Sequence, residues 1–308
     1  MRGAFIRALM EAACKNRRVV LLTGDLGFAV LDEFRARCPQ QFYNVGVAEQ
    51  NLAGVAAGLA LSGHVVFTYS IGNFPTLRCL EQVRNDICYH RADVKIVTVG
   101  GGLAYGALGV SHFATEDLAI LRALPELTVV APGDPVEVER LVPQIVERPG
   151  PVYLRLGRAG EKSLHDPATE IVLGRPTRAR AGSDTLLLTT GGMLPVALDA
   201  ATLLEADGVA AEVVSVHTLK PLDADAICAL AARFPIVITC EEHTALGGLG
   251  GAVAEVLLEA GVTPRFRRFA LPPAFPSGVG SQEYLRTVNR LDAPALRELV
   301  LSLRSGSR

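Results

Sequence analysis

One carboxylate, that of Glu49, lies at the start of a helix predicted over residues 46–62. The residues after it are mostly Ala, Gly, Leu and Val, and apolar surroundings of this kind disfavour the ionised form of a carboxylate. Such a carboxyl group can share its proton with a bound base. The alternative is an ordinary first-turn glutamate after a Gly46 N-cap, which the helix dipole favours. Because the side chains of this helix are small, we also expect it to form an interface.

A second candidate is His112, which ends the Gly-rich stretch 100–112. An imidazole transfers protons near neutral pH and can hydrogen-bond a ligand oxygen. Taken alone, a histidine in a Gly-rich loop is more often a simple surface residue. Both candidate segments follow predicted strands, and ligands of open α/β sheets bind beyond the carboxyl ends of the strands. The sequence therefore predicts a site at that edge of a sheet.

The elements that must position these residues alternate between short apolar strands and helices, as βα units on a parallel sheet do. The predicted strands are residues 18–23, 65–69, 94–99, 127–131 and 152–156. The predicted helices are residues 3–16, 46–62, 76–90, 116–123 and 135–147, the last with Asp134 as its N-cap. Together they predict a doubly wound domain over residues 1–158.

Residues 159–184 lose this periodicity and gather Gly, Pro, Arg and charged side chains, which is typical of a linker. A second βα series follows over residues 185–308. Its predicted strands are residues 185–190, 211–216, 236–240 and 265–269, and its predicted helices are residues 194–206, 224–232 and 250–260. The predicted fold class is therefore α/β, with two doubly wound domains and mainly parallel sheets.

The composition argues against several classes of protein. Thirty basic and 32 acidic side chains give a net charge of −2, so we expect neither a nucleic-acid nor a membrane partner. No apolar run approaches the ~18 residues that span a bilayer, and the first residues lack a signal-peptide core, so we expect a cytoplasmic protein. The six cysteines include no Cys-x-x-Cys pair. A mean hydropathy of +0.30 indicates surface that is covered in an oligomer.

Several motifs together resemble the C-terminal half of transketolase, a thiamine-diphosphate enzyme that moves a two-carbon ketol unit between sugars. The resemblance covers nearly the whole chain. Its motifs are Gly24-Asp25-Leu26, residues 44–51, Phe74 followed by Glu81-Gln82-Val83-Arg84, Ser111-His112, Pro132-Gly133-Asp134, residues 151–158 and Leu219-Lys220-Pro221-Leu222-Asp223. The Gly-Asp-Gly and Asn motif that binds Mg²⁺ and diphosphate in full-length transketolase does not occur in these residues. The chain thus resembles the β-type subunit of a split transketolase.

The resemblance implies a transketolase-type transferase of carbohydrate metabolism, built from a pyrimidine-binding domain and a transketolase C-terminal-like domain. Its cofactors would be thiamine diphosphate and Mg²⁺, with the metal ligands on the partner chain and none on this one. The partner would be an N-terminal-half transketolase subunit, in an α₂β₂ heterotetramer, and a homodimer of this chain is the alternative assembly. The substrate would be a sugar or a sugar phosphate.

Family roles carry over onto matching positions. Glu49 matches the glutamate that hydrogen-bonds N1′ of the aminopyrimidine, a catalytic and cofactor-binding role. His112 matches the histidine that reaches the substrate, so it is expected to be both catalytic and substrate-binding. Phe74 is expected to stack on the pyrimidine ring, and Tyr69 is the alternative because the spacing to Glu81 differs from the usual pattern.

Two further positions have weaker family roles. Arg158 matches the arginine that binds the anionic end of a sugar substrate, with Arg155 as the alternative. Asp25 matches an acidic position near the cofactor and the dimer interface, although an aspartate in a strand-end turn is often only a turn residue.

Two departures from the family pattern bear on the substrate. Leu108 lies where transketolases usually carry an acidic residue that contacts a substrate hydroxyl, and Gly100 lies where they often carry a histidine. Since buried hydrogen-bonding groups discriminate strongly between substrates, we expect a sugar that is deoxygenated or branched at that carbon, or else an unusual nucleotide-linked or secondary-metabolic sugar.

Two other functions fit parts of the pattern. The β subunit of a 2-oxo acid dehydrogenase would have the same two-domain architecture, and a non-catalytic scaffolding subunit would keep the fold without the chemistry. A dinucleotide-binding oxidoreductase is less well supported, since no complete Gly-x-Gly-x-x-Gly motif follows a predicted strand.

Overall fold

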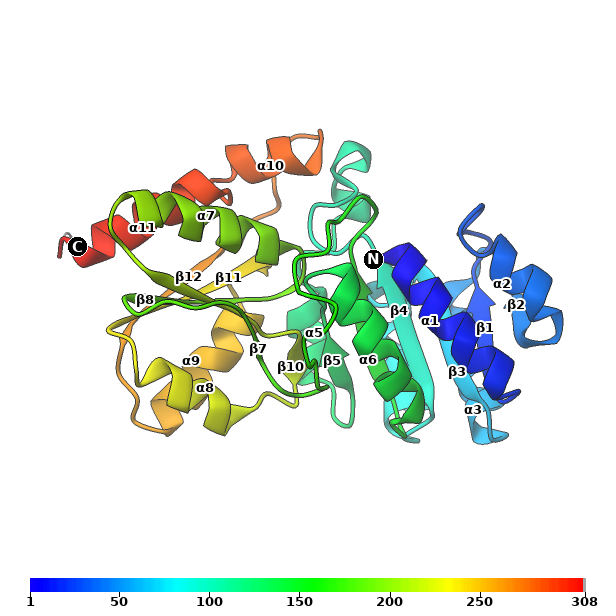
Figure 1. Cartoon of the computed structure of the whole chain (residues 1–308). Coiled ribbons are helices and arrows are strands. Elements are labelled where there is room, and N and C mark those ends of the chain that lie inside the picture. Colours follow the sequence, from blue (N-terminus) through cyan, green and yellow to red (C-terminus); the bar gives the residue numbers. More distant parts are fainter. Residues whose placement is uncertain (307–308) are drawn as a thin grey trace.

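Two neighbouring sheets of mainly parallel strands form the computed structural model, which describes residues 1–306 (Figure 1). The strands are β1 (Val19–Thr23), β2 (Phe42–Asn44), β3 (Val65–Ile71), β4 (Val94–Val99), β5 (Thr128–Val130), β6 (Val152–Leu156), β7 (Thr177–Arg180), β8 (Thr185–Thr189), β9 (Ala211–Ser215), β10 (Thr218–Lys220), β11 (Ile236–Thr244) and β12 (Arg265–Leu271). The first sheet has the order β10-β5-β6-β4-β3-β1-β2, and the second has the order β12-β11-β8-β9-β7. Only β10 and β7 pair antiparallel with their neighbours in these sheets. The predicted α/β fold with two mainly parallel sheets is confirmed.

The helices are α1 (Arg2–Lys15), α2 (Asp32–Arg37), α3 (Glu49–Leu61), α4 (Leu80–Gln82), α5 (Asp117–Ala123), α6 (Pro135–Glu147), α7 (Leu194–Ala206), α8 (Ala224–Ala231), α9 (Leu249–Glu259), α10 (Gln282–Val288) and α11 (Ala293–Arg304). In the part of the chain that the structure describes, no helix is both long and apolar enough to cross a membrane.

Both faces of the first sheet are covered by helices. Helices α1 and α6 lie on one side of this sheet (Figure 1). Val19 and Leu21 of β1 belong to the core on that side, whereas Val20 and Leu22 belong to the core that contains residues of α3 and α5. Successive side chains of a strand alternate between its faces, so a strand that is covered on both sides is apolar throughout. This burial explains the continuous apolar runs in the sequence.

The second sheet is covered by α7 and α11 on one face and by α8 and α9 on the other (Figure 1). The core under α8 and α9 is continuous with the core under α3 and α5. Strand β10 links the two domains, because it follows β9 in the chain yet pairs with β5 of the first sheet. The domains therefore share one of their cores.

Three strands, β2, β7 and β10, lie where the sequence predicted none. Strand β7 falls within the predicted linker 159–184 and pairs antiparallel with β9, so this part of the linker belongs to the second sheet. Its side chains are only partly buried, as on a sheet edge, and therefore carry no apolar alternation. Strands β2 and β10 are each three residues long, too short for a periodic signal. The domain boundaries at residues 158 and 185 stay a prediction.

Two helices near the candidate residues differ from their predicted bounds. The helix predicted from residue 46 begins at Glu49, because Gly46 adopts a φ of +77° and Ala48, the observed N-cap, is not helical. The helix predicted over residues 76–90 is divided into a 3-10 turn (Leu77–Cys79), α4 and a π-helical segment (Val83–Cys88). Segments of π-helix are frequent at functional sites.

A buried ion pair joins α5 to β6. The carboxylate of Asp117 accepts hydrogen bonds from Nε of Arg155 at 2.8 Å and from the hydroxyl of Tyr153 at 2.6 Å. Arg155 also donates to the carbonyl oxygens of Ala114 at 2.7 Å and Glu242 at 3.1 Å. The guanidinium thus ties the loop after β4 and the second domain to the first sheet.

We expect Asp117→Asn to lower the free energy of unfolding by about 3–5 kcal/mol, because it leaves Arg155 buried without its counter-charge. Urea denaturation followed by circular dichroism measures this loss. The control is Glu139→Gln, which breaks an exposed ion pair with Arg7 and should cost less than about 1 kcal/mol. Equal midpoints for the two variants would contradict a structural role for the buried pair.

Glu241 of β11 holds the N-terminus of α9. Its carboxylate accepts hydrogen bonds from the backbone N–H groups of Leu249 at 2.7 Å and Gly250 at 2.8 Å. Burial nevertheless raises the pKa of Glu241 to about 7, since desolvation outweighs these hydrogen bonds. In the pH range between its ordinary value of 4.5 and about 7, the folded chain therefore binds a proton that the unfolded chain releases.

It follows that Glu241 makes the free energy of unfolding fall as the pH rises from about 4.5 to 7. The expected loss is about 3 kcal/mol, since one pKa unit corresponds to about 1.4 kcal/mol. Glu241→Gln should flatten this slope, and Glu259→Gln, which alters an exposed carboxylate at the other end of α9, should not. Urea denaturation midpoints of the wild type and both variants, measured from about pH 4.5 to 7, give these slopes. A slope that is unchanged in Glu241→Gln would show that this carboxyl group does not titrate there.

Candidate functional site

Three of the predicted site residues form one continuous row at the carboxyl edge of the first sheet. Oε2 of Glu49 accepts a hydrogen bond from Nη1 of Arg78 at 2.9 Å. The guanidinium carbon of Arg78 lies 4.5 Å from the centroid of the Phe74 ring. The ring centroids of Phe74 and His112 are 5.2 Å apart at an interplanar angle of 68°. Arg78 therefore connects Glu49 to the aromatic ring and, through that ring, to the histidine.

Glu49 begins α3 and is buried, with 3% of its side chain exposed. A small cavity of about 10 Å³ lies beside it, lined mainly by apolar side chains such as Leu52, Val83 and Ile96. This cavity holds at most about one water molecule. Burial raises the pKa of the nearby Cys79 thiol to about 12, and the negative charge of Glu49 contributes to this increase. Within residues 1–306, Arg78 is the only side chain that hydrogen-bonds the carboxylate.

Tyr69, the alternative aromatic platform, lies elsewhere. It belongs to β3, is 1% exposed and stacks on Phe5 of α1 with ring centroids 6.2 Å apart and an interplanar angle of 18°. Burial raises the pKa of its hydroxyl well above the usual value. Tyr69 is therefore a core residue on the α1 side of the sheet, whereas Phe74 is only half-buried and lies beside Arg78 and His112.

Asp25 takes part in a turn that positions α3. Its carboxylate accepts a hydrogen bond from the amide of Asn44 at 2.9 Å, and its backbone N–H donates to the Asn44 side-chain oxygen at 3.0 Å. The same oxygen accepts from the backbone N–H of Gly46 at 3.0 Å. Asp25 is exposed and adopts a φ of +59°. Through Asn44 it stabilises the loop before Glu49, and it is not part of the row.

His112 is half-buried and ends a 3-10 turn (Val110–His112) in the loop after β4. Its Nδ1 atom lies 3.0 Å from Oγ of Ser111, which leaves Nε2 for another partner. Leu108 precedes it in the same loop and is 54% exposed. On the other side, the centroid of the Tyr105 ring lies 6.2 Å from that of His112.

Arg158 extends the row beyond Tyr105. Its guanidinium carbon lies 5.0 Å from the centroid of the Tyr105 ring, and its side chain is exposed. Arg155, the alternative anion-binding arginine, is 4% exposed and is engaged by Asp117, so its guanidinium has a structural role. The two arginines therefore differ clearly in availability to a ligand.

Sequence reasoning missed Arg78 and Tyr105, the two residues that connect the row. Tyr105 also accounts for Gly100. A Cβ atom at residue 100 would collide with the Tyr105 ring, and Gly100 adopts a φ of +83°, which disfavours any other residue. The tyrosine ring thus fills the space that a side chain at residue 100 would take. Tyr105 could have been noticed in the sequence, because it is an aromatic residue within the Gly-rich stretch 100–112.

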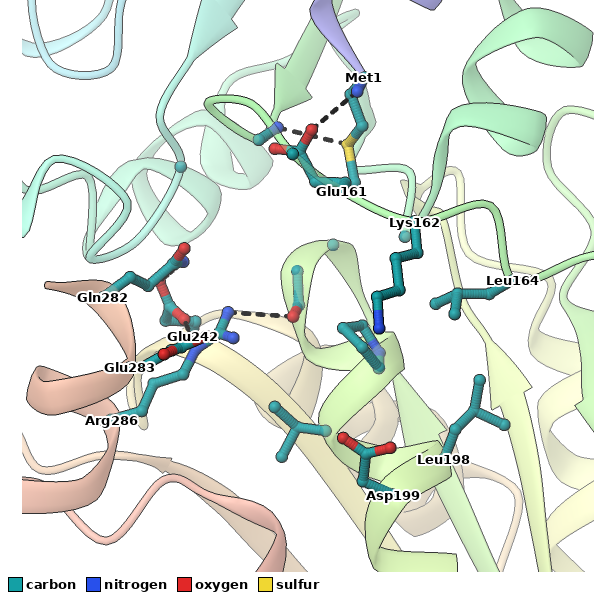
Figure 2. A pocket seen from close by; sticks show the side chains of 18 of the residues that line it. Met1, Glu161, Lys162, Leu164, Leu198, Asp199, Glu242, Gln282, Glu283 and Arg286 are labelled. Atoms are coloured by element: carbon teal, nitrogen blue, oxygen red, sulfur yellow. Dashed lines mark hydrogen bonds and ion pairs between the residues drawn. The ribbon is translucent and has the colours of Figure 1, made fainter.

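A larger cavity lies between the two domains, next to the Arg158 end of this row (Figure 2). It has a volume of about 570 Å³ and is lined by the segment after β6, the turn before α7 and parts of α10. Figure 2 shows Lys162, Asp199 and Glu283 around it, and Arg286 donates a hydrogen bond to Glu242 in its wall. Of the residues predicted for the site, only Arg155, the alternative to Arg158, lines this cavity.

Comparison with known proteins identifies both halves of the chain. Residues 1–160 match the family described as "Transketolase, pyrimidine binding domain", and residues 174–291 match "Transketolase, C-terminal domain". The fold, the site and these matches define the class of the chain, namely a thiamine-diphosphate-type pyrimidine-binding domain followed by a transketolase C-terminal domain.

Several relatives are similar over almost their whole length. An apulose-4-phosphate transketolase subunit of Phocaeicola vulgatus is 38% identical over 86% of this chain and 85% of its own. The 6-deoxy-6-sulfo-D-fructose transketolase subunit SqwH of a Clostridium species is 37% identical over 93% of this chain and 88% of its own. A solved structure of a split gene transketolase, described as an inactive β4 tetramer, is 37% identical, has a TM-score of 0.90 and is covered to 97%.

The chain belongs to the transketolase family and corresponds to the β-type subunit of a split transketolase. The transketolase of Campylobacter jejuni shares its fold, with a TM-score of 0.81 at 18% identity, and the chain covers 46% of that protein. The comparisons therefore confirm the predicted family and do not favour a 2-oxo acid dehydrogenase subunit or a scaffolding subunit.

Proposed function

We propose that the chain provides the pyrimidine side of a thiamine-diphosphate site that transfers a two-carbon ketol unit between sugars. The observation that carries the proposal is the row from Glu49 through Arg78 and Phe74 to His112. An N-terminal-half transketolase subunit would supply the rest of the site in an α₂β₂ heterotetramer. The relative described as an inactive β4 tetramer supports this requirement, since in that protein β chains alone assemble without activity.

The residues of the row fit an aminopyrimidine ring. The space between the Glu49 carboxylate and the Phe74 ring already holds a flat group with N–H donors, the Arg78 guanidinium. An aminopyrimidine is also flat, can stack on an aromatic ring and can share a proton with a carboxyl group. Among residues 1–306 no three His, Cys, Asp or Glu side chains are grouped to hold a metal ion, and we place the Mg²⁺ ligands on the partner chain.

The residues of this chain then have distinct tasks. Thiamine diphosphate, when bound, supplies the carbanion chemistry of ketol transfer. Glu49 shares a proton with N1′ of the pyrimidine, and its burial keeps water from competing for that proton. Phe74 orients the ring by stacking. His112, whose Nδ1 is held by Ser111, presents Nε2 to a substrate oxygen and can move a proton there.

The substrate site would lie along the outer part of the row. Arg158 is exposed and offers a guanidinium fork that suits a phosphate or a sulfonate. Two relatives carry a phosphate or a sulfo group in the names of their sugars. Leu108 offers no hydrogen bond to a substrate hydroxyl, so the sugar would be deoxygenated or branched near that carbon. A cytoplasmic location also stays an expectation from the sequence.

Reconstitution with an N-terminal-half transketolase subunit tests this proposal. The complex should transfer a ketol unit from a ketose phosphate to an aldose only when both chains, thiamine diphosphate and Mg²⁺ are present. Release of carbon dioxide from a 2-oxo acid without ketol transfer would instead indicate the dehydrogenase function. Co-assembly without any turnover would indicate a scaffolding subunit.

A further inference from the structure

Arg78 makes the two contacts that the proposed function assigns to the aminopyrimidine ring. It donates a hydrogen bond to Oε2 of Glu49 at 2.9 Å, and its guanidinium carbon lies 4.5 Å from the centroid of the Phe74 ring. A ring that bound Glu49 and stacked on the same side of Phe74 would need the volume that this guanidinium fills. The arginine and the cofactor therefore compete for one position.

We propose that Arg78 is a gate that closes the pyrimidine position in the cofactor-free chain and moves out when thiamine diphosphate binds. The proposal rests on the proposed function, because it assumes that the pyrimidine binds between Glu49 and Phe74. It adds a step to that function, the displacement of a side chain of this same chain.

A gate requires a side chain that can move, and Arg78 is far more exposed to solvent than Glu49. The Glu49 side chain is 3% exposed, whereas the Arg78 side chain is 50% exposed and can rotate into solvent without unfolding its surroundings. Arg78 lies on the short 3-10 turn between β3 and α4, and its guanidinium bonds no other side chain in the described part of the sequence. The arginine is therefore the mobile member of the pair.

Arg78 also stabilises the buried Glu49 carboxylate in the cofactor-free chain. A buried carboxylate is stable only when it is paired or protonated, and the guanidinium supplies that pairing while no ring nitrogen is present. Binding of the cofactor then exchanges one partner of Glu49 for another. If Arg78 occupies the pyrimidine position in most chains, only the remaining open fraction can bind the cofactor. The apparent dissociation constant then equals the intrinsic one divided by that open fraction.

The test measures the binding of thiamine diphosphate with Mg²⁺ to the reconstituted complex by stopped-flow fluorescence. For Arg78→Gln we expect the association rate to rise and the dissociation constant to fall by about threefold to tenfold, as for an open fraction that rises from about 10–30% to nearly one. The dissociation rate should not change. Arg78→Lys keeps the charge without the flat guanidinium group. Its association rate and dissociation constant should lie between those of the wild type and those of Arg78→Gln. Arg7→Gln, which breaks an exposed ion pair on α1, should bind as the wild type does.

Other outcomes overturn the gate. Weaker binding through faster dissociation would show that Arg78 holds the bound cofactor, and unchanged rate constants would show that it does not obstruct the site. A second measurement does not depend on a variant: cofactor should increase the modification of Arg78 by phenylglyoxal, and protection of Arg78 would contradict the proposal. If the wild-type complex binds no thiamine diphosphate at all, the proposed function itself fails, and the gate fails with it.

Discussion

Glu49→Gln in the reconstituted complex is expected to lower kcat by about 10²- to 10⁴-fold, the usual contribution of a positioned proton-transfer group. The glutamine has nearly the shape of the glutamate and can still hydrogen-bond Arg78, but it cannot share a proton with a ring nitrogen. Glu49 is buried, and it is the only carboxylate among the residues that line the small cavity beside it, so no second carboxylate is placed to replace it.

The change should appear in turnover and leave the assembly intact. Steady-state ketol transfer, with size-exclusion chromatography of the complex, separates the two effects. Glu11→Gln, on the exposed side of α1, is the control and should keep wild-type turnover. A kcat for Glu49→Gln within about threefold of the wild type would contradict the assigned role and favour a scaffolding subunit.

His112→Ala is expected to have the second-largest effect, a loss of about 10²- to 10³-fold in kcat/KM for the sugar substrate. Its imidazole lies 5.2 Å, centroid to centroid, from the Phe74 ring on the exposed part of the row, where a substrate on the cofactor would lie. The dissociation constant of thiamine diphosphate should change little, since the histidine acts on the substrate.

His90→Gln is the matched control for this variant. His90 is exposed, and its ring packs edge-on against that of Tyr89, away from the row. Its replacement should therefore change neither kcat/KM for the sugar nor the dissociation constant of thiamine diphosphate. Equal losses of cofactor affinity and kcat/KM in His112→Ala would mean that the histidine supports the pyrimidine position instead of the substrate.

The fold could be predicted from the sequence because the central strands of the doubly wound sheets leave a local signal. Strands such as β1 and β4 are buried on both faces, so they read as continuous apolar runs. The strands that escaped prediction, β2, β7 and β10, are short edge strands whose pairing depends on contacts with other parts of the chain. The breaks in the helix over residues 76–90 were missed because its changes of register depend on packing.

The candidate site was predictable only in part, and for a similar reason. Glu49 and His112 lie in recognisable motifs, and the structure brings them into one row. Arg78 gave no signal, because a lone arginine before a helix gains its meaning only from the carboxylate and the ring that it contacts. The alternatives Phe74 and Tyr69 could be distinguished only by burial, which the spacing to Glu81 does not determine.

The central claim is that this chain forms only the pyrimidine side of a site shared with a second protein. Isothermal titration with thiamine diphosphate and Mg²⁺, on this chain alone and on its complex with the N-terminal-half subunit, tests it most directly. We expect binding at least about 100-fold weaker for the chain alone, a difference of about 2.7 kcal/mol. Equally tight binding by an oligomer of this chain without a partner would contradict the claim.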